Sequence, residues 1–182
     1  DTIRRLKMID PVYWIANDVG NRNKINDNCI FHSSESLIDW QVPQNIFKQL
    51  NIESPIPYIS DEILFADTDQ IDFITRIIRI RKDLYGESFA SNEGLLRRSV
   101  YKQISYWMKV IEKLSPMIVL FEQPPHLVHH YSLYYSAKKK GLRTIIINRV
   151  GDPIRFLLSE NINNLVPEKI VNEPNKVERI SV

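Results

Sequence analysis

Residues 117–150, MIVLFEQPPHLVHHYSLYYSAKKKGLRTIIINRV, are the stretch of sequence that decides the fold class. Met117–Phe121 and Thr144–Ile147 are short apolar runs rich in branched residues, which is typical of strands buried on both faces. The segment between them has helical spacing and ends in Lys138–Gly141, where basic residues followed by glycine indicate a helix C-terminus. Such a strand–helix–strand crossover predicts two parallel strands in one sheet.

The sequence before this stretch predicts more strands and the helices that cover them. Pro11–Ala16 and Asn28–Phe31 have strand composition. Apolar residues at three- and four-residue spacing predict a helix from Thr68 to near Gly86, and Ser91–Glu93 opens a longer one. We therefore expect an α/β protein with a Rossmann-like three-layer fold, in which helices flank a mainly parallel sheet.

Three segments depart from this pattern. Gln41–Ile59 carries several prolines around a helical turn at Ile46–Leu50, which predicts an irregular excursion. Gly151–Leu158 resembles a turn that leads into a short helix. The C-terminal stretch is polar and contains prolines. We expect a Rossmann-like domain over residues 1–163 and a polar tail or linker over 164–182, leading toward a C-terminal domain that this sequence does not contain.

Composition excludes several classes of protein. The chain has 24 basic and 22 acidic residues, mixed along its length, and a net charge of +2, which argues against a nucleic-acid groove built from bulk charge. A single cysteine, Cys29, excludes an intrachain disulfide and favours a reducing compartment. No apolar run approaches the length of a membrane span. We expect a cytoplasmic domain, cut from a longer protein because the sequence opens on Asp1, with membrane association only through segments absent from this sequence.

Polar residues follow each predicted strand, where a parallel sheet gathers its ligand-binding loops. Carboxyl ends of parallel strands meet at one edge of the sheet, so residues far apart in sequence come together there. Hydrogen-bonding and titratable side chains at that edge suit polyhydroxylated ligands. The predicted substrate-binding residues are Asn17, Asp18, His32, Ser33, Glu122, Gln123, Asn148 and Arg149.

His126 is the predicted catalytic base. It follows a double proline at the predicted start of a helix, where exposed amide groups favour a neutral imidazole that could accept a proton. The alternative is that His126 only caps or packs the helix start. His129 and His130 lie inside the helix and are expected to be structural. The three histidines have helical spacing that invites a metal interpretation, yet no carboxylate or cysteine accompanies them, so we predict no metal site.

Several catalytic motifs are missing from the sequence. A serine nucleophile elbow would need Gly-x-Ser-x-Gly, which does not occur. With five glycines in the chain, neither the dinucleotide fingerprint nor the P-loop pattern occurs either. We therefore predict no bound cofactor, and disfavour a small hydrolase or phosphate-handling enzyme.

Several short segments resemble one known family. They are Pro11–Ile15 at a first strand, Phe31–Ser33 at a second, Tyr106–Trp107 in the long helix, Pro125–His126 before Leu133–Tyr134, and Lys140–Thr144. Over roughly residues 9–160 the chain resembles bacterial capsular or surface polysaccharide biosynthesis proteins related to two-domain (GT-B type) glycosyltransferases, and in particular their N-terminal half.

The resemblance implies a function that the composition alone does not. In such enzymes the N-terminal half binds the saccharide acceptor and can supply the base, which would be His126 here, while the C-terminal half holds the nucleotide sugar. This chain has no room for that second half. The alternative function is a noncatalytic α/β binding or scaffold module that recognises a saccharide or a protein partner through the same edge.

Overall fold

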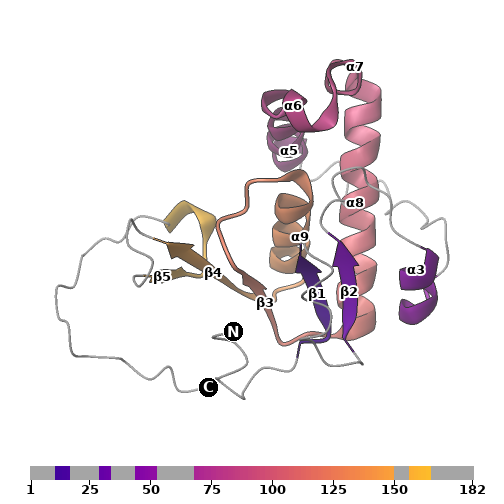
Figure 1. Cartoon of the computed structure of the whole chain (residues 1–182). Helices are drawn as coiled ribbons and strands as arrows, with labels where there is room; N and C mark the ends of the chain where they lie inside the picture. Colours follow the sequence, from indigo (N-terminus) through magenta and orange to yellow (C-terminus); the bar gives the residue numbers. More distant parts are fainter. Residues whose placement is uncertain (1–10, 17–28, 34–43, 53–67, 150–155, 165–182) are drawn as a thin grey trace.

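The computed structural model describes residues 11–16, 29–33, 44–52, 68–149 and 156–164 and shows a mixed α/β protein (Figure 1). The predicted sites Asn17 and Asp18, the tail after residue 164 and most of the Gln41–Ile59 excursion lie outside the described residues. The elements in chain order are β1 (Tyr13–Ala16), β2 (Ile30–Ser33), α3 (Gln44–Leu50), α5 (Thr68–Ile80), α6 (Lys82–Tyr85), α7 (Glu87–Ala90), α8 (Glu93–Leu114), β3 (Ile118–Phe121), α9 (Val128–Lys139), β4 (Arg143–Arg149), β5 (Phe156–Ser159) and the 3-10 helix η2 (Ile162–Asn164).

The strands form two small sheets. β1 and β2 are parallel, with Tyr13 opposite Ile30, and β3 and β4 are parallel, with Ile118 opposite Arg143. The predicted crossover of residues 117–150 is therefore confirmed as β3–α9–β4. Among the described residues no ladder joins the two sheets, and the second sheet is mixed because β5 runs antiparallel to β4.

β5 corrects the prediction of a helix within Gly151–Leu158. Phe156–Ser159 is a strand, and Leu158 lies opposite Ile147 of β4. A four-residue apolar run does not distinguish a strand from a helical turn by its own periodicity. The neighbouring edge of β4 decides the conformation, because it supplies hydrogen-bond partners for the β5 backbone.

The long helix α8 begins and ends at residues that suit its termini. The Asn92 side chain accepts a hydrogen bond from the Leu95 backbone N–H at 3.1 Å, and Ser115 ends the helix in the left-handed conformation at φ 44°. The apolar side chains of α8 at three- and four-residue spacing are buried between these ends, except for Leu95, which is 44% exposed in the first turn, and Leu114, which is partly buried at the last residue.

We expect Asn92→Ala to lower the free energy of unfolding by about 1 kcal/mol, because it removes the side-chain acceptor of the Leu95 N–H. Urea unfolding followed by circular dichroism measures this change. Asn92→Asp keeps an acceptor and should cost less than half as much. Equal losses in the two variants would show that the cap does not stabilise α8.

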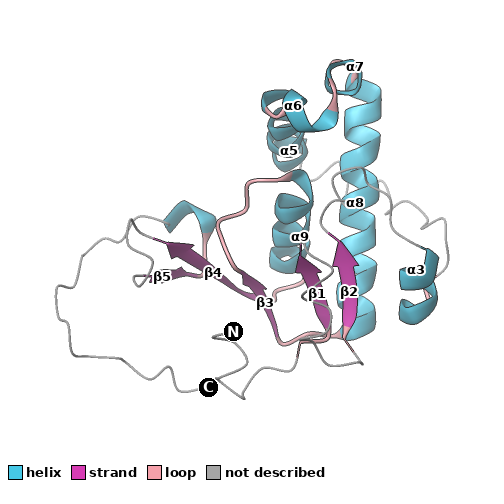
Figure 2. Ribbon diagram, in the orientation of Figure 1, coloured by secondary structure: helices cyan, strands magenta, loops and turns pink. Residues whose placement is uncertain are grey.

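Helices α8 and α9 lie side by side and carry the apolar core (Figure 2). One cluster joins α5, α7, α8 and the start of α9, through residues such as Ile74, Leu96 and Val128. A second joins α3, β1, β2 and α8 around Trp107, and a third joins α9 to β3 and β4. Leu133 of α9 packs against both the second and the third cluster, so α9 connects the two sheets.

Candidate functional site

The predicted site residues that the structure describes lie in the loop after β3 or in the strands β2 and β4. Glu122 and Gln123 follow β3 and are exposed. Asn148, near the end of the adjacent strand β4, is partly buried and has interactions of its own. Ser33 and Arg149 are the last residues of β2 and β4, where only their backbone is described. Since β3 and β4 are parallel, the residues that follow them share one sheet edge.

His32 is placed in the core and not on the surface of that edge. Its side chain is fully buried, and its Nδ1 lies 2.6 Å from the Tyr13 hydroxyl oxygen. Burial lowers the pKa of His32 to about 4, because the cationic form loses its hydration. The imidazole is therefore neutral at pH 7 and, in this structure, bonds to a tyrosine.

Two tyrosines continue the contact made by His32. The Tyr13 hydroxyl lies 2.7 Å from the Tyr106 hydroxyl, so it takes part in two hydrogen bonds at once. Burial raises the pKa of both phenols, so both remain protonated at neutral pH. Trp107 packs edge-to-face on both tyrosine rings, at centroid distances of 5.7 Å and 4.9 Å. These residues fix β1 and β2 against α8.

His126 is exposed and has a defined tautomer. Its Nδ1 lies 3.1 Å from the Pro124 carbonyl oxygen. A carbonyl oxygen only accepts, so Nδ1 carries the hydrogen and donates it. In the neutral ring the second nitrogen, Nε2, then has a free lone pair, as a general base needs. A backbone carbonyl therefore orients His126 as a proton acceptor.

His126 does not cap α9. The N-cap residue is Leu127, which provides no side-chain hydrogen bond, and α9 begins at Val128. The Val128 N–H donates instead to the Tyr85 hydroxyl of α6, at 3.2 Å. Sequence reasoning missed Tyr85, since nothing in its local sequence indicates a contact with α9. Of the two non-catalytic roles considered for His126, capping is not observed, because Tyr85 accepts the hydrogen bond of the Val128 N–H. Packing is observed, because the His126 ring contacts that of His130.

The other histidines pack behind His126. The rings of His126 and His130 are 4.8 Å apart between centroids, and those of His130 and His129 are 4.3 Å apart, both edge-to-face. His129 is fully buried, and neither of its ring nitrogens has a hydrogen-bond partner. Burial and the neighbouring imidazoles lower the pKa of His130 to about 4 and that of His129 further. His32 contributes to the shift of His129, so all four histidines of the chain gather in one region.

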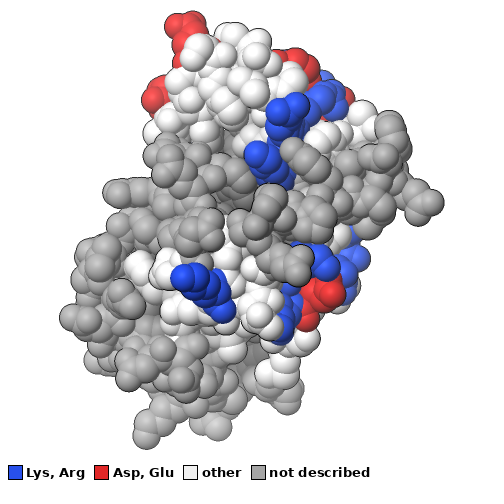
Figure 3. Space-filling view, turned by 90° about the vertical axis from the view of Figure 1, so that its right-hand side faces the viewer, with Lys and Arg blue, Asp and Glu red and all other residues white. Residues whose placement is uncertain are grey.

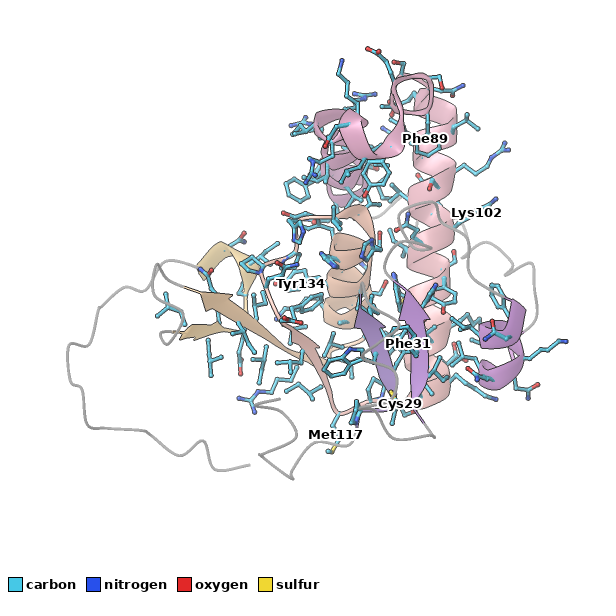
Figure 4. The ribbon with its side chains drawn as sticks, in the orientation of Figure 1. Cys29, Phe31, Phe89, Lys102, Met117 and Tyr134 are labelled. Atoms are coloured by element: carbon cyan, nitrogen blue, oxygen red, sulfur yellow. The ribbon has the colours of Figure 1, made fainter. Side chains whose placement is uncertain are left out.

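Helices α8 and α9 contain further buried polar groups. Gln103 Oε1, Trp107 Nε1 and Ser132 Oγ are buried without a hydrogen-bond partner. By contrast, Ser136 donates to the Ser132 carbonyl at 2.7 Å. On the other side of α9, Tyr134 packs toward β3 and donates from its hydroxyl to Asn161 Oδ1 at 3.1 Å (Figure 4).

The described residues contain neither a metal-ligand cluster nor a membrane-spanning helix. No group of three or more His, Cys, Asp or Glu side chains there is arranged to hold a metal ion. No helix in the described part of the chain is both long and apolar enough to cross a membrane. Lys and Arg atoms occur in separate groups on the face shown in Figure 3, without a continuous basic surface among the residues described there.

The arrangement offers one exposed, oriented imidazole beside polar loop residues, above a buried group of neutral imidazoles. It can accept a proton from a hydroxyl and hydrogen-bond to a polar ligand. No family model, curated protein or solved structure matches this chain.

Proposed function

We propose that this chain is the acceptor-side domain of a glycosyltransferase-like protein of surface polysaccharide biosynthesis, in which His126 is the general base. The observation that supports the proposal most is the hydrogen bond from His126 Nδ1–H to the Pro124 carbonyl oxygen. It leaves Nε2 as the proton acceptor on an exposed ring, at the edge where the loop after β3 ends. The family resemblance of the sequence supplies the reaction class.

The proposed reaction needs little from this domain beyond positioning and proton removal. His126 Nε2 takes the proton of an acceptor hydroxyl while its oxygen attacks the anomeric carbon of a nucleotide sugar. The new glycosidic C–O bond forms as the bond to the nucleotide diphosphate breaks, and the diphosphate leaves with the electron pair. Glu122 and Gln123, exposed beside His126 in the loop after β3, would bind acceptor hydroxyls. A second domain would hold the nucleotide sugar.

A Rossmann-like, mainly parallel sheet is part of this proposal. In Figure 1 β1 is drawn between β2 and β3, and Leu133 contacts the core clusters of both sheets. Pairing between β1 and β3 would produce one sheet in the order β2-β1-β3-β4-β5, with four parallel strands and an antiparallel edge. Such an order places ligands at the carboxyl ends of the parallel strands.

The burial of His32 favours the second candidate, a noncatalytic binding or scaffold module. One or two titratable imidazoles were expected at the strand edge; of His32 and His126, only His126 is exposed. One imidazole with polar neighbours suffices to bind a saccharide. The two candidates differ in what the loss of Nε2 does: it abolishes catalysis in the first and only weakens binding in the second.

We expect His126→Asn to lower sugar transfer at least about 100-fold, measured in the protein that carries both halves. Asparagine can still donate to the Pro124 carbonyl oxygen but has no group in place of Nε2. Stability should change by less than about 0.5 kcal/mol because the site is exposed. Lys102→Ala, at an exposed position of α8, is the control and should leave transfer unchanged.

The isolated chain allows a test that does not need the second half. Long-range ¹H–¹⁵N spectra should show His126 as the Nδ1–H tautomer at pH 7.5. Titration with surface-polysaccharide oligosaccharides should shift the signals of Glu122, Gln123 and His126 in a saturable way. Saturable binding with full transfer activity in His126→Asn would remove the base role, and no shift with any saccharide or nucleotide sugar would remove the acceptor site.

A further inference from the structure

We propose that the four histidines, His32, His126, His129 and His130, form a pH-sensitive contact that fixes the first turns of α9 against β2 and α8 at neutral pH and releases them on acidification. The role proposed for this histidine cluster is distinct from the catalytic role proposed for His126. His32 and His129 are fully buried, His130 is partly buried and His126 is exposed. The proposal concerns the buried members and does not need the protein to be a transferase.

Three of the four rings contact one another from the surface into the core, and His32 lies near enough to the innermost of them, His129, to help lower its pKa. Edge-to-face contacts run from His126 to His130 and on to His129. His129 and His32 come from α9 and β2, which are far apart in sequence, and both are fully buried. His32 in turn bonds to Tyr13 of β1. A proton added to one of these rings therefore affects the packing between α9, β2 and α8.

The polar groups around the buried rings do not compensate an added charge. His32 Nε2, His130 Nδ1 and both nitrogens of His129 have no hydrogen-bond partner. The tyrosines that face or adjoin the cluster from β1, α8 and α6 are neutral at physiological pH: Tyr13, Tyr106 and Tyr85. The described charged groups on the neighbouring elements are exposed or form ion pairs elsewhere, such as Asp72 of α5 with Arg97 of α8 and Arg143 of β4 with Glu160.

The sign of the pH effect follows from the neutral state of the rings. In the packed form the pKa of His32 and that of His130 are lowered to about 4, whereas a released imidazole titrates near 6.5. The released form therefore binds more protons between pH 6.5 and pH 4. The packed form is fully favoured above pH 6.5. Below pH 6.5, each buried histidine raises the equilibrium constant for release by up to about tenfold per pH unit.

Release should be local because the remaining core contains no histidine among its described residues. The cluster that joins α5 and α8 consists of apolar side chains such as Ile71, Ile74 and Leu96. These apolar side chains have no group that gains or loses a proton in this pH range. Acid should therefore loosen the His32 and His129 region before it loosens α5 and the first half of α8.

Native-state hydrogen exchange of the chain at several pH values between 7.5 and 4.5, corrected for intrinsic exchange rates, tests the proposal. Amides of residues 130–134 and 30–32 should lose at least tenfold more protection than those of residues 100–110 between pH 7 and pH 5. His129→Leu removes a titrating ring of similar size and should lower the midpoint of this loss by at least half a pH unit. If that variant does not fold, His130→Gln at the partly exposed position serves instead, and His126→Asn should give the smallest shift.

Three results would overturn the proposal. Simultaneous loss of protection in all elements would mean that acid unfolds the whole chain. Unchanged protection down to pH 4.5 would mean that the cluster does not respond to acid in this range. A pH profile that stays identical to that of the unmodified chain in both His129→Leu and His130→Gln would mean that other groups cause the response.

Discussion

Replacing Trp107 with alanine should lower the free energy of unfolding by about 3–5 kcal/mol, the largest loss that we expect from any single substitution in this chain. The side chain is 1% exposed and packs on Tyr13 and Tyr106. Alanine leaves a cavity between α8 and the β1–β2 sheet, because the surrounding rings cannot close over the lost volume. Urea unfolding followed by circular dichroism measures the loss.

Trp107→Phe separates the volume of the ring from its N–H group. Phenylalanine keeps an aromatic ring and deletes an N–H that has no hydrogen-bond partner in the structure. It should therefore cost only about 1–2 kcal/mol. A loss as large as that of Trp107→Ala would mean that the indole N–H is satisfied and contributes to stability. A loss below about 1 kcal/mol in Trp107→Ala itself would contradict the packing described for this cluster.

The parts of the fold that sequence predicted are those set by local pattern. The β3–α9–β4 crossover follows from two branched apolar runs and a lysine-rich helix end, and α8 follows from Asn92 and the apolar stripe behind it. β5 was mistaken for a helix because its conformation depends on the edge of β4 and not on its own four residues. A single mainly parallel sheet was expected from the strand–helix–strand pattern, but among the described residues no ladder joins β1 or β2 to β3. Pairing between strands distant in sequence depends on their placement in three dimensions, which local pattern does not determine.

The candidate site shows the same limit. His126 could be predicted from the sequence because its features are local. It follows two prolines, and its Nδ1 donates to the carbonyl oxygen of Pro124, only two residues away. The burial of His32 depends on Tyr106 of α8, and the cap of α9 depends on Tyr85 of α6. Such contacts join residues far apart in sequence, and a single sequence contains no signal that pairs them. The gathering of all four histidines became visible only with the structure.

Replacing Tyr13 with phenylalanine should destabilise the protein by about 2–3 kcal/mol, although only one oxygen atom is removed. That oxygen takes part in hydrogen bonds to both His32 Nδ1 and the Tyr106 hydroxyl. Without it, neither ring nitrogen of His32 has a hydrogen-bond partner, since Nε2 already lacks one. The loss of stability then includes the full desolvation cost of the buried His32 ring, which is larger than the net contribution of an ordinary hydrogen bond. Unfolding at pH 7.5 measures the effect while His32 is neutral.

Tyr106→Phe provides the matched comparison because it removes only one of the two hydrogen bonds of Tyr13. It should cost about 1–2 kcal/mol. The double variant should be about 1 kcal/mol more stable than the sum of the two losses predicts, because Tyr13→Phe alone already breaks the bond between the hydroxyls. Strict additivity would show that the hydroxyls of Tyr13 and Tyr106 do not interact. In that case His32 would depend on β1 alone, and α8 would contribute to its position only through ring packing.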